Sequence, residues 1–337
     1  MHSDFLWEAA SYPKKALPIL SFPVARKLGI TVRELIHSSE LQAKVMEYAA
    51  HNTNTAAAVS LMDLSVEAEA FGAEVSFSDW EVPTVRGCVV SDEAEAEALA
   101  IPSVGSGRTG ICVEAIALAK EAIPDKPLLA GIIGPYSLAG RLMDVTEIMY
   151  ACYDDPQIVH TVLAKCTQFL IDYALAFKAA GADGVIMAEP LAGLLNADMA
   201  DEFSCRYGKR ILEAVQREDF PVVYHNCGNA ALSILPELLD MGCAAYHFGN
   251  AVSMEEVLKK APADVLCMGN ISPAERFAGT SVSAMRLAAR ALMDTCGAYP
   301  NFIPSSGCDI PAYAAWENIM AFYEEVENTK NIGMNGS

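Results

Sequence analysis

Short, continuously apolar runs alternate with longer amphipathic stretches from about residue 127 to the C-terminal region. Such runs are typical of parallel strands that helices cover on both faces, because neither face of the strand meets water. The pattern, with one similar run earlier in the chain, predicts strands at 56–62, 128–134, 184–189, 222–227, 244–248, 265–270 and 302–305. A further strand is less distinct: it lies near 75–80 or has no apolar run of its own.

This alternation predicts an α/β protein, and the strand count and the length of 337 residues favour a single (β/α)8 TIM-type barrel. A doubly wound sheet fits the alternation almost as well. Asp155-Pro156 predicts the start of a helix that runs to Phe177, and Ser272-Pro273 the start of a shorter one. We find no repeat or Pro/Gly-rich linker, so we expect one domain over 1–337, with an N-terminal helical extension over about 1–50 and a frayed tail over about 328–337.

The formal net charge of −20 makes nucleic acid or an anionic membrane an unexpected partner, because phosphate groups would be repelled. The N-terminus lacks the pattern of a secretory signal, and no run is long and apolar enough to span a bilayer, so we expect a cytoplasmic protein. The ten cysteines lie mostly in apolar segments, where in a reducing compartment most would be small core residues.

Polar residues end several of the predicted strands, where barrel enzymes assemble their active sites. They are Asp63, Glu189, His225, Asn226, Cys227, Asn250, Asn270, Ser272 and Cys308. His225 and Cys227 are two residues apart, so in a strand both side chains point to the same side. Taken alone, the pair is weak evidence for a metal, because a buried cysteine beside a hydrogen-bonded histidine also explains it. Cys308, from another strand end, completes a set of zinc ligands that leaves a fourth position open.

Five segments of the chain resemble the uroporphyrinogen decarboxylase superfamily, and in particular its methylcobamide:coenzyme M methyltransferase branch: 62–75, 131–142, 224–229, 269–280 and 305–311. The resemblance runs from about residue 20 to 325. It implies a barrel of the uroporphyrinogen decarboxylase type and Zn2+ bound by His225, Cys227 and Cys308. It also implies methyl transfer between a corrinoid, held on a separate protein, and a thiol such as coenzyme M.

The chain departs from the decarboxylases at several of their binding residues. Their N-terminal arginine cluster is missing, and Arg141 stands where they have a tyrosine. Asp63 matches the aspartate that centres their tetrapyrrole substrate, although it could also cap the helix that follows. Asn250 occupies a place where some of the methyltransferases have an acidic residue, so water, His247 or nothing takes the fourth zinc position before substrate arrives.

We therefore predict Asp63 and Glu189 as catalytic residues and expect six residues to line the barrel mouth and bind substrate: Tyr136, Arg141, Asn226, Asn250, Asn270 and Ser272. The G-x-G-x-x-G at 105–110 does not follow a strong strand, which favours a flexible or substrate-covering loop over a dinucleotide site. Residues 64–100 could cover the site, contact a partner or do both.

Three other functions remain open. The first is a corrinoid-dependent demethylase of O- or N-methylated compounds, which would use the same ligands. The second is decarboxylation of uroporphyrinogen, which needs no metal. The third is a zinc-binding docking module without catalysis.

Overall fold

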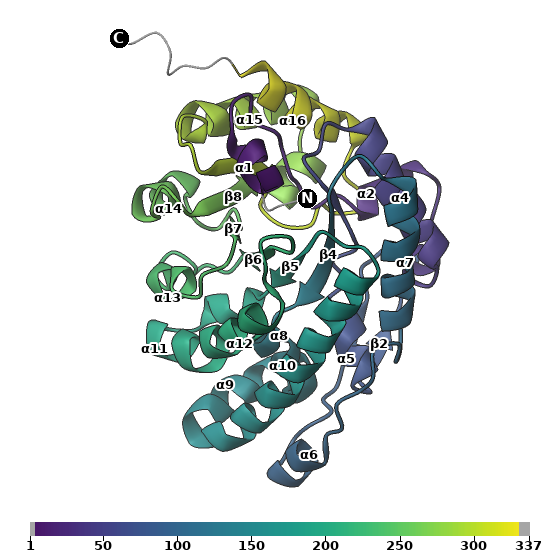
Figure 1. The fold of residues 1–337 in the computed structure, drawn as a ribbon, viewed down its shortest axis with the longest axis vertical. Coiled ribbons are helices and arrows are strands. Elements are labelled where there is room, and N and C mark those ends of the chain that lie inside the picture. Colours follow the sequence, from purple (N-terminus) through teal and green to yellow (C-terminus); the bar gives the residue numbers. More distant parts are fainter. Residues whose placement is uncertain (1–3, 330–337) are drawn as a thin grey trace.

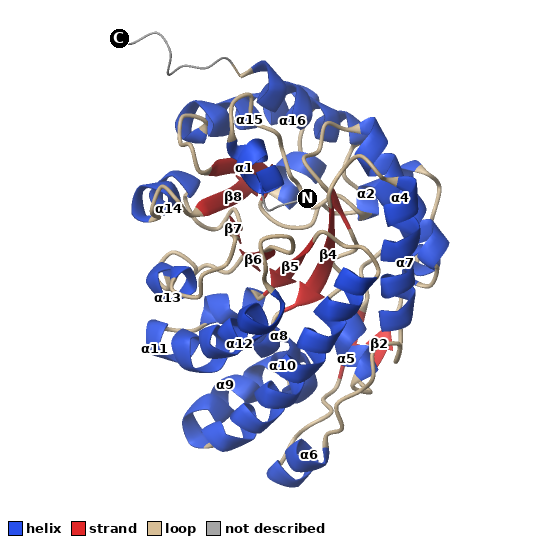
Figure 2. Cartoon of the chain, viewed as in Figure 1, coloured by secondary structure: helices blue, strands red, loops and turns tan. Residues whose placement is uncertain are grey.

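Seven parallel strands form one curled sheet in the centre of the molecule, and helices surround it (Figure 2). The computed structural model describes residues 4–329. In spatial order the strands are β1 (Ala58–Val59), β4 (Leu128–Ile133), β5 (Gly184–Ala188), β6 (Val222–Asn226), β7 (Ala245–Phe248), β8 (Leu266–Ile271) and β9 (Phe302–Ser306). The order follows the chain without reversal, whereas a doubly wound sheet reverses at a switch point. The predicted TIM-type barrel is confirmed, and all seven predicted strands are present.

Of the two alternatives for the remaining strand, a barrel strand near 75–80 is wrong, because this region is not part of the central sheet. Residues in this region form a separate antiparallel hairpin of β2 (Glu74–Ser76) and β3 (Thr84–Arg86). Their side chains are exposed or half-buried, so they lack the two covered faces of a barrel strand.

An extended segment near the N-terminus lies between the two ends of the sheet instead. The Leu17 amide donates to the carbonyl of Pro304 in β9 (3.0 Å), and the Ala56 amide donates to the carbonyl of Ala16 (2.9 Å). The Ser305 hydroxyl donates to the carbonyl of Leu17 (2.7 Å). This segment therefore bridges β9 and the approach to β1.

The helices follow the chain around the sheet (Figure 1). Those before β4 are α1 (Asp4–Ala10), α2 (Phe22–Lys27), α3 (Val32–Ile36), α4 (Ser39–Asn52), α5 (Val66–Ala70), α6 (Glu93–Ala98) and α7 (Thr109–Ala122). Those after β4 are α8 (Pro135–Met143), α9 (Val145–Asp154), α10 (Pro156–Ala179), α11 (Ala197–Ala200), α12 (Arg206–Val215), α13 (Leu235–Leu239), α14 (Met254–Lys260), α15 (Val282–Cys296) and α16 (Trp316–Asn328). A 3-10 turn, η1 (Pro190–Leu194), and two π-helical turns, η2 (Asp201–Cys205) and η3 (Pro273–Ala278), complete the set.

Both predicted helix starts are confirmed, at Pro156 of α10 and at Pro273 of η3, which Ser272 caps. The N-terminal extension contains α1 to α4, which precede β1. Most of the predicted tail lies outside the described residues, which end at 329. The assignment of 1–337 to one domain stays a prediction. Among the described helices, none combines the length and apolarity needed to cross a membrane.

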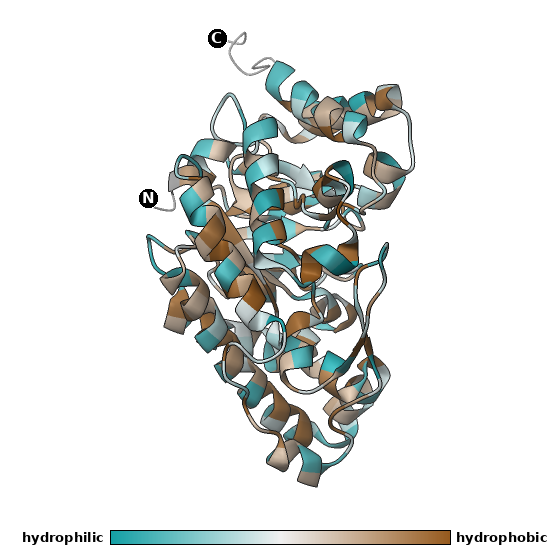
Figure 3. Ribbon diagram, turned by 90° about the vertical axis from the view of Figure 1, so that its right-hand side faces the viewer, coloured by the Kyte–Doolittle hydropathy of each residue, from teal (hydrophilic) through white to brown (hydrophobic). Residues whose placement is uncertain are grey.

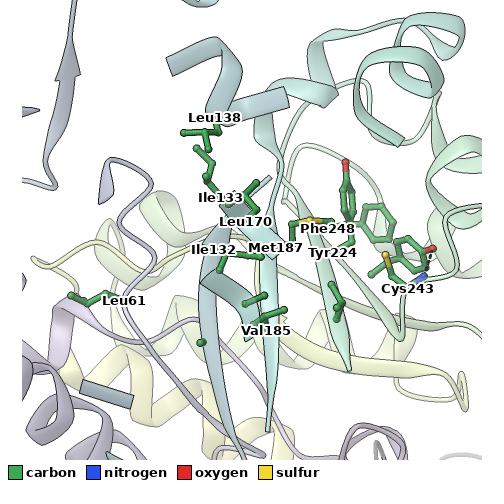
Figure 4. Packing of buried hydrophobic residues seen from close by; sticks show 14 of the residues in the cluster. Leu61, Ile132, Ile133, Leu138, Leu170, Val185, Met187, Tyr224, Cys243 and Phe248 are labelled. Atoms are coloured by element: carbon green, nitrogen blue, oxygen red, sulfur yellow. Dashed lines mark hydrogen bonds between the residues drawn. The ribbon is translucent and has the colours of Figure 1, made fainter. Parts of the chain in front are cut away.

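The core has two layers because successive residues of a strand face opposite sides. The inner layer fills the barrel and includes Val59, Leu129, Ile186, Ala188, Val223, Ala245, Met268 and Ile303. The outer layer lies between strands and helices, where side chains of β4, β5 and β6 cluster with Leu138 of α8 and Leu170 of α10 (Figure 4). Accordingly, the helices carry both hydrophobic and hydrophilic residues (Figure 3).

Helix α1 packs into the inner layer through Phe5 and Leu6. Lys14, which follows it, donates from Nζ to the carbonyls of Tyr299 (2.9 Å) and Phe302 (3.0 Å) at the start of β9. Helix α1 is thus tied to the amino end of β9, and the carboxyl ends of the strands remain for a site.

Candidate metal centre

Three predicted metal ligands meet at the carboxyl end of the barrel. The ligand atoms of His225, Cys227 and Cys308 all lie within 4.8 Å of one another. His225 belongs to β6, Cys227 follows that strand, and Cys308 follows β9. Because β7 and β8 lie between β6 and β9, the curvature of the sheet brings the two ends together.

The imidazole of His225 is held with one nitrogen free. Its Nδ1 lies 3.3 Å from the carbonyl oxygen of His247, so Nδ1 carries the proton and donates it. Its Nε2 is buried and has no hydrogen-bond partner among the described residues. A buried polar atom without a hydrogen-bond partner lowers the stability of the folded protein. A metal-binding histidine commonly donates from one ring nitrogen to a carbonyl oxygen and leaves the other nitrogen free for the metal.

The thiols of Cys227 and Cys308 form a hydrogen bond with each other. The hydrogen bond from Cys308 lowers the pKa of Cys227 to about 4, despite partial burial. The same contact, together with burial, raises the pKa of Cys308 well above its usual value. Two sulfurs and one imidazole nitrogen fit Zn2+, because these are its typical ligands.

Glycines allow the chain to close around the three ligands. A Cβ atom added at Gly249 would lie 2.5 Å from the Cα of Cys227, and one added at Gly307 would lie 2.7 Å from the backbone nitrogen of Asn250. Such distances leave no room for a side chain. Asn250, predicted to bind substrate, is exposed and lies against the residue before Cys308.

His247 packs beside His225, with ring centroids 4.6 Å apart. Its Nε2 donates to the carbonyl of Ser306 (2.6 Å) and lies 3.0 Å from the Ser305 hydroxyl. Burial and the neighbouring His225 lower the pKa of His247 to about 3, so its ring is neutral near pH 7. His247 therefore links β7 to β9, and the group of ligand atoms found in the described part of the chain does not include it.

Asp63 forms a buried ion pair with Arg108, a residue that we did not predict as part of the site. Arg108 Nε also bonds to Glu69 (2.6 Å), and its Nη2 donates to the Ser65 hydroxyl (2.8 Å). Asp63 in turn accepts from the Ser65 amide (3.0 Å) and hydroxyl (2.6 Å), which stabilises the start of α5. The loop at 105–110 thus delivers a guanidinium to Asp63, and a catalytic role for Asp63 stays a prediction.

Comparison with known proteins decides the family. The family described as uroporphyrinogen decarboxylase (URO-D) matches residues 13–329. The chain belongs to the URO-D family. This confirms the resemblance inferred from the five sequence segments, and it places the protein in a family of enzymes.

Relatives of this URO-D family member include proteins with two different names. The methylcobamide:CoM methyltransferase MtbA of Methanosarcina acetivorans is 26% identical over 275 residues, which make up 80% of this chain and 78% of the relative. The uroporphyrinogen decarboxylase of Alcanivorax borkumensis is 26% identical over 316 residues, 90% of this chain and 88% of the relative. Among solved structures, a methyltransferase from Methanosarcina mazei aligns with a TM-score of 0.84 at 22% identity, covering 97% of this chain and 98% of that one. That likeness shows the fold.

Glu189, which we predicted as catalytic, caps the start of helix α8. Its carboxylate accepts from the amides of Tyr136 (2.9 Å) and Ser137 (2.6 Å) at the start of α8. Burial raises the pKa of Glu189 to about 7. Because Ala188 faces the barrel interior, Glu189 faces the helices. The structure places it with α8 rather than with the three metal ligands, and its catalytic role stays a prediction.

The other predicted substrate residues mostly make bonds that hold the backbone. The Asn226 amide group donates to the carbonyl of Glu189 (3.0 Å), and that of Asn270 donates to the carbonyls of Gly249 (2.9 Å) and Val252 (2.8 Å). The Ser272 hydroxyl accepts from the Glu275 amide (3.2 Å). The buried Tyr136 hydroxyl lies 3.8 Å from the sulfur of Cys152. Their roles in binding stay predictions. The side chains of Arg141 and Asn250 have no hydrogen bond within the described protein, and of these two only Arg141 is half-buried.

Proposed function

We propose that this protein is a zinc-dependent methyltransferase that moves a methyl group between a corrinoid, carried by a separate protein, and a small thiol. The observation that carries the proposal is the buried, unpaired Nε2 of His225 beside the sulfurs of Cys227 and Cys308. The set offers three ligands at the reactive end of a barrel, where a fourth position can accept a substrate atom.

The side chains in this arrangement have distinct tasks. His225, Cys227 and Cys308 would hold the metal, and the His247 carbonyl fixes the His225 ring so that Nε2 points to the sulfurs. Bound zinc would lower the pKa of an incoming thiol and so supply a thiolate near neutral pH. Two thiolates and a neutral imidazole balance the charge of Zn2+, so the protein ligands do not repel a further thiolate.

An open groove of about 530 Å3 gives a partner a place to bind. Pro311 and Tyr313, which follow Cys308 by a few residues, line it together with Phe22 and Trp80. Trp80 is 72% exposed and Tyr313 is 61% exposed, so aromatic surface is available for contact. Trp80 belongs to the 64–100 region, which supports a role of that region in contacting the corrinoid or its carrier.

Metal analysis of wild type beside Cys308→Ala tests the centre. We expect about one zinc per wild-type chain and loss of most zinc in the variant, because two remaining ligands bind Zn2+ poorly. Cys88→Ala is the matched control: Cys88 is an exposed cysteine, and its removal should leave the zinc content unchanged. Full zinc occupancy in Cys308→Ala would refute the three-ligand centre.

Activity assays separate the remaining functions. Demethylation of methylcobalamin by thiols supports the proposal, whereas corrinoid methylation from methoxylated compounds or methylated amines would favour the demethylase. Coproporphyrinogen formed from uroporphyrinogen would favour the decarboxylase. Normal zinc content without turnover of any donor and acceptor would favour a docking module.

A further inference from the structure

Arg141 is a half-buried cation to which the protein gives no partner. All residues of helix α8 except Arg141 are buried, so the helix lies within the protein and only this side chain is partly exposed. Within residues 4–329, no hydrogen bond or ion pair holds the Arg141 guanidinium. Every other described arginine that is not exposed has carboxylate partners, as Arg108 and Arg286 show.

This isolation is informative because partial burial of a charge costs free energy that a counter-charge normally offsets. Burial lowers the pKa of Arg141, and the charge of Asp63 opposes that effect. The Asp63 carboxylate is already bound by Arg108 and by Ser65. The Arg141 guanidinium therefore keeps its donors available for an anion from outside the chain.

The position of Arg141 relates it to the metal centre. Helix α8 begins directly after β4, and Asp63 follows β1, so both lie at the carboxyl end of the barrel. Asp309, the residue after Cys308, lies within electrostatic range of the same Asp63 carboxylate. The charge of Asp63 thus acts both on Arg141 and on the segment that carries Cys308.

We propose that Arg141 binds a terminal anionic group of the methyl-accepting thiol, a carboxylate or a sulfonate, while the thiol sulfur meets His225, Cys227 and Cys308. This inference rests on the proposed function and adds to it the residue that would recognise the charge of the acceptor. In a protein with a net charge of −20, an anionic substrate is repelled on average, so a local cation is needed to select it. A planar guanidinium suits both groups, because it can donate two parallel hydrogen bonds to either.

Binding of matched thiols to the zinc-loaded protein tests the inference without a methyl donor. Calorimetry would compare 3-mercaptopropionate with its neutral isostere 3-mercaptopropionamide, and 2-mercaptoethanesulfonate would provide the sulfonate arm. We expect wild type to bind at least one anionic thiol about 10- to 100-fold more tightly than the amide. Arg141→Met should remove this preference with little change for the amide, and Arg141→Lys should keep part of it. Arg276→Met removes a charge from an exposed position and should change neither.

Equal binding of both anionic thiols and the amide by wild type would overturn the inference, as would a full preference retained in Arg141→Met. If Arg141→Met does not fold, Arg141→Gln and the wild-type comparison decide by the same criteria. Charge-selective binding without methyl transfer would contradict the proposed function while supporting the anion site. Methyl transfer to anionic and neutral thiols with equal KM would support the proposed function and contradict the anion site.

Discussion

Arg108→Met should destabilise the protein strongly, because it leaves the Asp63 carboxylate buried without its counter-charge. The side chains of Arg108 and Asp63 are 4% and 1% exposed, so water cannot replace the lost partner. Breaking a buried pair on one side costs about 3–5 kcal/mol. Glu69, whose side chain is 24% exposed, is more easily solvated and adds less. Methionine keeps most of the arginine stem, so the loss of packing is small.

Urea unfolding followed by circular dichroism measures this effect at pH 7. The matched control is Arg290→Met. Arg290 is 59% exposed, and its partner Glu325, which is 9% exposed, keeps Arg286 as a second cation. Loss of the more exposed of two cations should cost about 0–1 kcal/mol. The difference between the two variants exceeds the error of linear extrapolation, which is about 10–15% of the stability.

A second substitution separates the charge from the packing. Asp63→Asn in the Arg108→Met background should recover part of the lost free energy, because a neutral amide needs no counter-charge. Equal small losses in Arg108→Met and Arg290→Met, or no recovery in the double variant, would refute the view that charge pairing dominates here.

Two further predictions concern pH and metal affinity. Burial raises the pKa of Glu67 from 4.5 to about 7, so the stability of the wild type should fall as pH rises through this range. Glu67→Gln can still accept from the Ile133 amide and should reduce the fall by up to about 3 kcal/mol. A variant whose urea-unfolding stability changes between pH 4.5 and 8 as much as that of the wild type would contradict this. Gly249→Ala should weaken zinc binding about tenfold or more in chelator competition, because the new Cβ would meet the Cα of Cys227. Gly208→Ala is the control: its new Cβ would meet only the flexible Met241 side chain, so the zinc affinity should not change.

The strands that were predictable are those buried on both faces. A run such as 184–189 is apolar at each position but its last, and the structure forms β5 from its first five residues. The segment at 16–19 was not predicted because it contains Pro18, which cannot donate a backbone hydrogen bond and argues against a strand. Its role depends on bonds to Pro304 and Ala56, which are distant in sequence. Local pattern cannot supply such contacts.

The clustering of His225 and Cys227 was predictable because strand periodicity gives both residues the same side as Val223, which faces the interior. The same alternation puts Asn226 on the side of the sheet that faces the helices. Because Ala188 faces the interior, Glu189 faces the helices as well. Strand parity could therefore have separated these residues from the ligand set. Arg108 had no such signal, because the loop that carries it has no periodicity and its partner Asp63 is 45 residues away.

Charge balance at the carboxyl end of the barrel connects these observations. Arg108 is paired with Asp63 and Glu69, and Zn2+ would balance the thiolates of Cys227 and Cys308, so neither group offers a free cation to a substrate. Arg141 is different, because Asp63, the carboxylate whose charge acts on it, is already bound by Arg108. The protein carries a large negative charge overall, so this remaining cation should act as a filter for the acceptor rather than as a general attraction.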